Sequence, residues 1–289
     1  MASLKEVKQR IASVRSTQKI TSAMKMVASA KLHKAQAAIG NMLPYQQRLH
    51  SILTNFLGDN KDASSPFVKE RAVKRVAIVV FSSNTSLCGG FNANVIRRLM
   101  RLLDEYKFLD KENILIFPVG KKVEDAVRKA GFKIGGSYQS MANKPSYQEA
   151  ADLATDLMTR FLKEDIDKVE LLYNHFKNTA SQTLTRSIYL PIDLSRKQVK
   201  VSSENLPDYI IEPDSDSLLE ELLPKVLRIE LYTALLDSNA SEHGARTIAM
   251  QTATDNADGL LQDLTVMYNK SRQQAITNEL LDIIGGSLS

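Results

Sequence analysis

The sequence contains few of the residues on which disulfide-bonded, metal-centred or membrane-spanning proteins depend. Trp is absent, and Cys88 is the only cysteine among 289 residues, so no disulfide can form within the chain and a reducing compartment is favoured. The strongest apolar run, Val76–Phe81, is far shorter than the roughly 20 residues that a membrane-spanning helix needs. Neither an H-E-x-x-H nor a C-x-x-C pattern occurs, so we expect no metal site.

Proline and glycine are also scarce, at eight and twelve residues, which favours a helix-rich chain. Between residues 4 and 56, apolar residues recur every three or four positions, the spacing of a coiled-coil seam. Ser3 and Glu6 form a capping box before this stripe, Gln18 and Thr21 interrupt it, and Pro44 predicts a bend or an early end. The predicted seam residues are Leu4, Val7, Ile11, Val14, Met24, Ala28, Leu32, Ala35, Ile39, Met42, Tyr45, Leu49, Ile52 and Phe56.

The C-terminal part has the same pattern. Ser217 and Glu220 form a second capping box, and the periodic stretch continues from Leu222 until Gly285 and Gly286, which predict its end. Many seam positions are small, which lets two helices approach closely. They are Val226, Ile229, Thr233, Leu236, Ala240, Gly244, Thr247, Met250, Ala257, Leu261, Leu264, Met267, Ala275, Leu281 and Ile284.

Between the two ends, short apolar runs alternate with amphipathic stretches, which predicts an open, Rossmann-like α/β sheet that is parallel at least in part. The expected strands are 75–81, 114–119, 168–176 and 183–192, and the expected helices are 92–109, 122–130 and 147–164. Residues 62–66 and 202–217 are the expected linkers. The predicted domains are therefore a coiled-coil shaft (1–60 and 215–289) and an α/β foot (68–213).

Each terminal stripe is too long for the central domain to cover. At 1.5 Å per residue, residues 4–57 span roughly 80 Å and residues 218–284 roughly 100 Å, whereas a domain of this size is some 30–40 Å across. Each helix can cover the other if the two run antiparallel. The net charges, +8 for residues 1–57 and −3 for residues 225–289, favour this pairing modestly and leave an excess of +5 for an acidic partner.

The longer C-terminal helix outruns its mate by 13 residues, which places Leu280, Leu281, Ile283 and Ile284 on an apolar tip without cover. An exposed apolar end of this kind marks a docking surface.

Three local patterns each allow two interpretations. Residues 86–92 follow a strand and open a helix, as a phosphate loop does, but they lack its lysine and its glycine spacing. We expect a strand-to-helix turn there and no nucleotide or other cofactor. Cys88 is expected to be a buried, inert thiol because the four histidines are scattered through other segments. The acidic residues between 204 and 221 lack the calcium-loop spacing, which favours a solvated linker or a protein contact.

Two wider alternatives concern the basic N-terminal stretch. Residues 1–34 are basic, Ser-rich and poor in acids, as a transit peptide is, but the capping box at Ser3 favours a mature helix. The pI near 9.1 also allows a nucleic-acid adaptor, although aromatic residues are sparse and no nucleic-acid motif is present.

Specific runs of residues then identify the chain as similar to one family. These runs are 11–14, 17–21 and 23–28 near the N-terminus, 241–246, 252–256, 263–264, 268–270, 272–273 and 275–277 near the C-terminus, and 87–92 and 173–174 in the centre. They closely resemble the γ subunit of the F-type ATP synthase. The resemblance implies a rotor without a catalytic site. Its coiled coil stands inside the ring of α and β subunits, and its α/β foot rests with the ε subunit on the membrane c-ring.

The resemblance also implies roles for single residues. It places Met24, Lys25, Arg246, Arg272 and Gln273 against the β subunits, Leu280–Ile284 in an apolar bearing, and Tyr209 and Glu212 where the foot meets the c-ring. The alternative for each polar position is ordinary solvated helix surface. It further implies the cytoplasmic face of a bacterial inner membrane, and a single cysteine predicts no thiol switch. The chain departs from the family at residues 83–86, where Ser-Asn-Thr-Ser replaces the common Ser-Asp-Arg-Gly.

Overall fold

The structure is a computed structural model that describes residues 3–59, 65–192 and 215–287. It divides into two compact units. We call residues 1–29 with 246–289 the helical unit, and residues 30–245 the α/β unit. The terminal helices α1 (Leu4–Asp59) and α6 (Ser215–Ser287) each contribute to both units. Residues 30–59 and 215–245 therefore group with the sheet, although the pattern of the sequence assigns them to the shaft.

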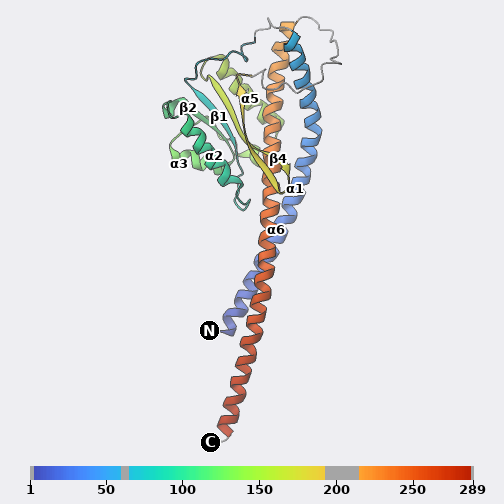
Figure 1. The fold of residues 1–289 in the computed structure, drawn as a ribbon, viewed down its shortest axis with the longest axis vertical. Helices are drawn as coiled ribbons and strands as arrows, with labels where there is room; N and C mark the ends of the chain where they lie inside the picture. Colours follow the sequence, from blue (N-terminus) through green and yellow to red (C-terminus); the bar gives the residue numbers. More distant parts are fainter. Residues whose placement is uncertain (1–2, 60–64, 193–214, 288–289) are drawn as a thin grey trace. The chain divides into compact units, whose positions relative to one another are not determined.

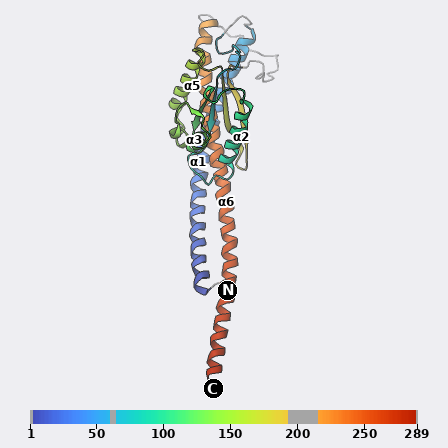
Figure 2. The same ribbon diagram turned by 90° about the vertical axis from the view of Figure 1, so that its left-hand side faces the viewer.

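The helical unit consists of the first part of α1 and the last part of α6, which run antiparallel and side by side (Figures 1 and 2). The predicted capping box at its start is confirmed. The main-chain N–H of Ser3 donates to Oε2 of Glu6 at 2.9 Å, and the main-chain N–H of Glu6 donates to Oγ of Ser3 at 3.3 Å. These bonds satisfy two of the N–H groups that a helix start leaves without partners.

The seam predicted for α1 is confirmed at nearly every described position, because its residues are buried or partly buried. Tyr45 is the exception, at 47% exposed. Thr21, expected to interrupt the stripe, is itself buried. On α6 the seam prediction fails at Met267, which is 49% exposed, and at Leu281 and Ile284, which are 60% and 55% exposed in the end also predicted to lack cover. Around Met267 the apolar rhythm drifts: the predicted Leu264 is buried, but the next covered residue is Tyr268, which is half-buried.

Two predicted helix breaks do not occur. Pro44 lies inside α1, which continues to Asp59. Its exposed position lets water satisfy the carbonyl group that loses its helical partner. The helix α6 begins at Ser215, ahead of the predicted cap, and extends through Gly285 and Gly286 to Ser287. A helical glycine costs only about 1 kcal/mol, so a glycine pair does not stop a helix by itself.

The α/β unit is built on one five-stranded sheet in the order β3-β2-β1-β4-β5. The strands are β1 (Val76–Phe81), β2 (Ile114–Val119), β3 (Lys133–Ile134), β4 (Lys168–Asn178) and β5 (Ser181–Leu190). The first four are mutually parallel, and β5 folds back antiparallel on β4. The predicted open, partly parallel sheet is therefore confirmed. Of these five strands, β3 is the one not predicted, because a strand of two residues leaves no periodic pattern.

Helices cover both faces of this sheet (Figure 1). Val76, Ile78 and Val80 of β1 face a core shared with α2 (Phe91–Glu105) and α3 (Lys121–Ala130). Ala77 and Val79 face a second core, shared with α4 (Gln139–Asn143), α5 (Tyr147–Leu162) and the buried residues of α1 and α6. A short 3-10 helix, Lys111–Asn113, precedes β2. Both faces of the sheet are thus buried, as a parallel sheet requires.

Candidate functional site

The helical unit holds its two helices in register through three polar pairs. Their side chains join Gln18 Nε2 to Asp258 Oδ1 at 2.5 Å, Thr21 Oγ1 to Thr254 Oγ1 at 2.9 Å, and Lys25 Nζ to Gln251 Oε1 at 2.8 Å. The residue numbers in each pair sum to 275 or 276, so Leu4, at the start of α1, lies opposite residue 271 or 272 of α6. The polar positions that interrupt the apolar stripe therefore specify the pairing, since only one register satisfies all of them.

This register leaves residues 273–287 of α6 beyond the first residue of α1 (Figures 1 and 2). Their length is roughly 22 Å at 1.5 Å per residue, close to the surplus predicted from the sequence. Four large apolar side chains lie exposed at this end: Leu280 (54%), Leu281 (60%), Ile283 (68%) and Ile284 (55%). Clustered apolar side chains of this size are rarely left in water without a partner.

The remaining predicted contact residues fall into three environments. Met24 and Lys25 are half-buried, and the ammonium group of Lys25 is engaged by Gln251 within the helical unit. Arg246 is buried. Arg272 and Gln273 are exposed, at the position where α6 loses its partner helix. Tyr209 and Glu212 lie outside the described residues.

In the α/β unit, α6 carries a feature that the periodicity does not reveal. Residues 231–244 are all buried except for the half-buried Tyr232, although the stretch includes Asp237, Asn239 and Ser241. Each of these three side chains bonds to a neighbouring element. Asp237 Oδ1 accepts from the main-chain N–H of Phe176 at 2.7 Å, Asn239 Nδ2 donates to the carbonyl of Ala142 at 3.1 Å, and Ser241 Oγ donates to the carbonyl of Asn174 at 2.9 Å.

The surroundings of Asp237 are strongly polar. Its second oxygen, Oδ2, lies 2.6 Å from Nδ1 of His175. Burial, together with the nearby carboxylates of Asp237 and Glu230, raises the pKa of Tyr173 to about 12. Tyr173 is therefore a neutral phenol at any physiological pH. The sequence alone does not single out this cluster, because polar residues that interrupt an apolar helix have the pattern of solvated positions.

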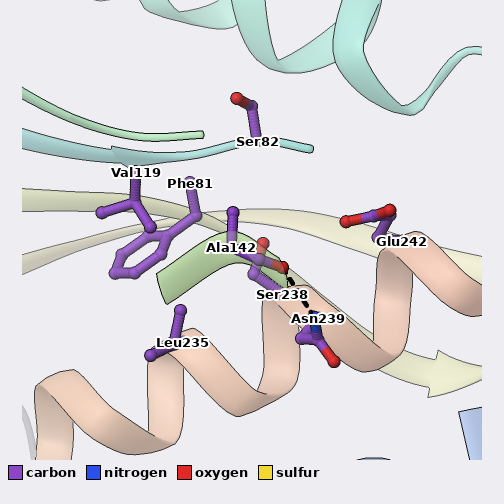
Figure 3. A pocket seen from close by; sticks show the side chains of 8 residues that line it. All are labelled: Phe81, Ser82, Val119, Ala142, Leu235, Ser238, Asn239 and Glu242. Atoms are coloured by element: carbon purple, nitrogen blue, oxygen red, sulfur yellow. Dashed lines mark hydrogen bonds between the residues drawn. The ribbon is translucent and has the colours of Figure 1, made fainter. Parts of the chain in front are cut away.

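A small cavity adjoins the same part of α6, at the carboxyl ends of β1 and β2 (Figure 3). Phe81, Ser82, Val119 and Ala142 line one side, and Leu235, Ser238, Asn239 and Glu242 of α6 line the other. Its volume of about 10 Å³ is at the lower limit for a single water molecule. A nucleotide does not fit this space.

The connection from β1 to α2 forms the predicted strand-to-helix turn. Asn92 Nδ2 donates to Ser83 Oγ at 2.8 Å, and the main-chain N–H of Ser83 donates to Asn92 Oδ1 at 3.1 Å. Cys88 is buried at 1% exposure, as predicted. Leu87 has a φ of 66° and is exposed.

The departure at residues 83–86 has a structural counterpart. Asn84 Oδ1 accepts from the main-chain N–H of Lys121 at 2.8 Å, and Asn84 Nδ2 donates to the carbonyl of Gln139 at 2.7 Å. An ionised Asp at this position could accept the first bond but could not donate the second. The asparagine therefore links the starts of α3 and α4.

A buried ionic cluster lies on the face of the sheet covered by α2. Glu170, fully buried, accepts from Arg186 Nε at 2.7 Å and Nη2 at 2.9 Å, and from Tyr106 Oη at 2.6 Å. Lys168 Nζ lies 2.9 Å from Oε1 of the same carboxylate. Burial by itself would raise the pKa of Glu170, but the hydrogen bonds from Arg186, Tyr106 and Lys168 outweigh it and hold the pKa below its usual value. The group is structural, joining β4, β5 and α2.

Within the described ranges, no three His, Cys, Asp or Glu residues lie close enough together to hold a metal ion. Across the same ranges, no helix combines the length and apolar character that a membrane crossing requires. The features that stand out are the antiparallel helix pair of the helical unit and the exposed apolar side chains at the end of α6.

This arrangement is typical of a central-stalk subunit of a rotary enzyme, and comparison with known proteins agrees. The sequence model of the family described as "ATP synthase" matches residues 3–289. ATP synthase gamma chains from Phocaeicola vulgatus and Bacteroides fragilis are 70% and 63% identical to this chain, with full coverage of both sequences. The chain belongs to the ATP synthase gamma chain family. As a member it is a non-catalytic subunit of that enzyme and part of its central stalk.

Solved structures support the same fold. The central stalk and c-ring structure of the Tetrahymena thermophila mitochondrial ATP synthase contains a chain that is 25% identical, with a TM-score of 0.58, and the match covers 81% of this chain and 99% of that one. A chain of the Euglena gracilis mitochondrial ATP synthase is 21% identical with a TM-score of 0.65, covering 99% of this chain and 93% of that one. Of the two functions that the sequence leaves open, family membership favours the rotor subunit over the nucleic-acid adaptor.

Proposed function

We propose that the chain is the rotating shaft of a bacterial F-type ATP synthase. Proton flow turns the c-ring, the chain turns with it, and its changing contacts drive each β subunit in turn through binding, synthesis and release of ATP. A contact that differs between two conformations of a β subunit shifts the balance between them by the difference in contact free energy. The chain itself needs no catalytic group for this role.

The observation that carries this proposal is the exposed end of α6. Residues 273–287 have no partner helix opposite them in the helical unit, yet they present Leu280, Leu281, Ile283 and Ile284 to the outside. A close-fitting apolar socket in a ring of α and β subunits would cover these side chains while letting the helix turn, because apolar contacts have no preferred direction.

The polar positions have narrower proposed roles. Arg272 and Gln273 are exposed at the base of this end and are the best placed to touch β-subunit loops. Met24 and Lys25 would face the acidic segment of the β subunits, although Lys25 must then share its ammonium group with Gln251. Arg246 is buried, so we propose that it supports this contact surface from within the chain.

The other proposed partners are the ε subunit and the membrane c-ring. The α/β foot, with the domain boundaries predicted from the sequence, would rest with the ε subunit on the c-ring, and Tyr209 and Glu212 would contribute to that contact. The location that follows is the cytoplasmic face of the inner membrane, as a peripheral subunit. With Cys88 buried and alone, we propose that no thiol switch regulates the chain.

Reconstitution tests this proposal directly. The chain is mixed with α and β subunits of a bacterial ATP synthase, and the product is separated by gel filtration in buffers of increasing salt concentration. We expect an α3β3 complex that retains the chain at high salt, because the apolar end contributes binding that salt does not screen. A chain with Ile283→Asp and Ile284→Asp should dissociate more readily. Failure of the unaltered chain to join any α3β3 complex would overturn the proposal.

A further inference from the structure

The stretch of α6 from Leu231 to Gly244 is unusual because it is buried all round and yet strongly polar. A helix that is buried on all sides is ordinarily apolar on all sides, and buried polar side chains require fixed partners. Here those partners are main-chain groups of β4 and α4. Contacts of this kind hold a helix at one angle, whereas purely apolar packing leaves its rotation less strictly defined.

The hydrogen bonds of this stretch resist rotation of α6 because they lie on two sides of the helix. Asp237 and Ser241 are four residues apart, so they lie on the same face of α6, and both bond to the main chain of β4. Asn239 is two residues from each, about 200° around the helix, and bonds to Ala142 of α4 on the other side (Figure 3). A rotation of α6 about its own axis, in either direction, must therefore stretch bonds on both sides.

The fit around Gly244 adds a steric element on the β4 face. Gly244 lies seven residues after Asp237, on the same face of the helix. A Cβ atom at this position would lie 3.1 Å from Cε2 of Phe176, closer than ordinary packing allows. Phe176 is also the residue whose main-chain N–H is held by Asp237. The helix thus lies tightly against β4 at both ends of the bonded stretch.

We propose that Asp237, Asn239 and Ser241 form a torsional clamp that fixes α6 on the sheet of the α/β unit and transmits torque from the foot into the shaft. This inference rests on the proposed rotary function. The three are positioning residues, because they act through α6 and touch no substrate. Because α6 is one continuous helix, a rotation of its clamped segment is passed on to the part that continues past Ala245. The clamp therefore sets the torsional stiffness between the foot and that part of α6.

The test measures this stiffness in the assembled enzyme. A bead is attached to the foot through Phe108→Cys, a position that is 70% exposed, while the α3β3 head is immobilised. Angular fluctuations of the bead are recorded without nucleotide, since their variance is inversely related to stiffness. The triple variant Asp237→Ala, Asn239→Ala, Ser241→Ala should show at least about a twofold larger variance, because hydrogen bonds resist distortion steeply.

The chain provides a matched control in Thr233→Val. The Thr233 hydroxyl is buried and donates to the carbonyl of Ile229 in α6 itself at 2.8 Å. Its removal therefore eliminates a buried hydroxyl of the same helix without touching the clamp, and the variance should remain that of the reference chain. A triple variant that assembles, hydrolyses ATP and shows the reference variance would overturn the clamp.

Two further measurements distinguish a failure of the clamp from a failure of assembly or of the rotary function. If the triple variant fails to assemble, Ser241→Ala is compared with Thr233→Val, since each removes one buried hydroxyl. A larger variance for Ser241→Ala alone supports the clamp, and equal variances overturn it. ATP-driven rotation of the bead-labelled reference chain is recorded first. An assembled, ATP-hydrolysing reference that does not rotate contradicts the rotary function, whereas rotation with unchanged variance in the variants contradicts only the clamp.

Discussion

The helix α6 occupies two contrasting environments along its length. In the helical unit it has one partner, α1, and much of its surface is exposed, including Leu260, Val266 and Leu280. In the α/β unit the same helix is enclosed, with Leu231 and Ser241 both at 0% exposure. One continuous helix therefore combines a largely exposed segment with a segment enclosed by its own chain.

The largest effect is expected from truncation in the enclosed segment. Leu231→Ala should lower the free energy of unfolding by about 4 kcal/mol, because the site is fully buried and the surrounding core cannot fill the cavity. Leu260→Ala, at a position that is 51% exposed, should change it by no more than about 0.5 kcal/mol. Urea unfolding followed by circular dichroism measures both. Equal losses at the two positions would remove the distinction between the two environments.

The buried ionic cluster provides a pH-dependent contrast. Glu170→Gln should cost about 3 kcal/mol, at the lower end for a broken buried pair, because Arg186 and Lys168 are partly exposed. The pKa of Glu170 is lower in the folded chain than in the unfolded one. Its contribution is therefore fully present above the unfolded-state pKa and is lost as pH falls through the folded-state pKa.

Urea titrations between pH 7 and pH 3 measure this dependence. We expect the unaltered chain to lose stability more steeply on acidification than Glu170→Gln, which has no proton to take up at this position. Parallel pH profiles for the two chains would mean that Glu170 does not contribute through its charge.

A smaller effect is expected in the helical unit, where the polar pairs are open to water. A double-mutant cycle with Gln18→Ala and Asp258→Ala should give a coupling free energy of about 1 kcal/mol, as for a partly exposed hydrogen bond to a charged group. Hydrogen exchange of the main-chain amides of residues 7–25 is the measurement. Additive effects of the two substitutions would mean that this pair does not stabilise the register.

The smallest effect in free energy concerns the exposed base of the α6 end. Arg272→Ala with Gln273→Ala should reduce the turnover of the assembled enzyme about threefold, less than 1 kcal/mol in activation free energy, and should leave the complex intact. Gln262→Ala, exposed on the paired part of α6, is the control and should have no effect. Unchanged turnover in the double variant would assign Arg272 and Gln273 to ordinary helix surface.

How far the sequence predicts the fold depends on how each feature is encoded. The seam at Val7, Leu32 and Leu49 and the cap at Ser3 follow from local periodicity and local hydrogen bonding, and both are confirmed. The strands β1 and β2 are found because a buried strand is a continuous apolar run. The two-residue β3 is missed because its pairing with β2 depends on contacts far apart in sequence.

The candidate site shows the same division. The exposed end of α6 follows from comparing helix lengths, so the sequence is sufficient to find it. The clamp is not found, because Asp237, Asn239 and Ser241 interrupt an apolar pattern and are indistinguishable from solvated positions until their main-chain partners are known. The failure at Met267 has a related cause, since an apolar residue in a two-helix pair is buried only if the phase of the helix brings it to the seam.

The rotary role is tested by observing whether the chain turns within the assembled enzyme. Phe108→Cys in the α/β unit provides an exposed attachment site for a probe, and the buried Cys88 does not compete for the label. The chain is assembled with α and β subunits, the head is fixed to a surface, and ATP is added. We expect the probe to rotate in one direction in discrete steps at a rate set by ATP concentration. A complex that retains the chain and hydrolyses ATP while the probe stays fixed would contradict the account.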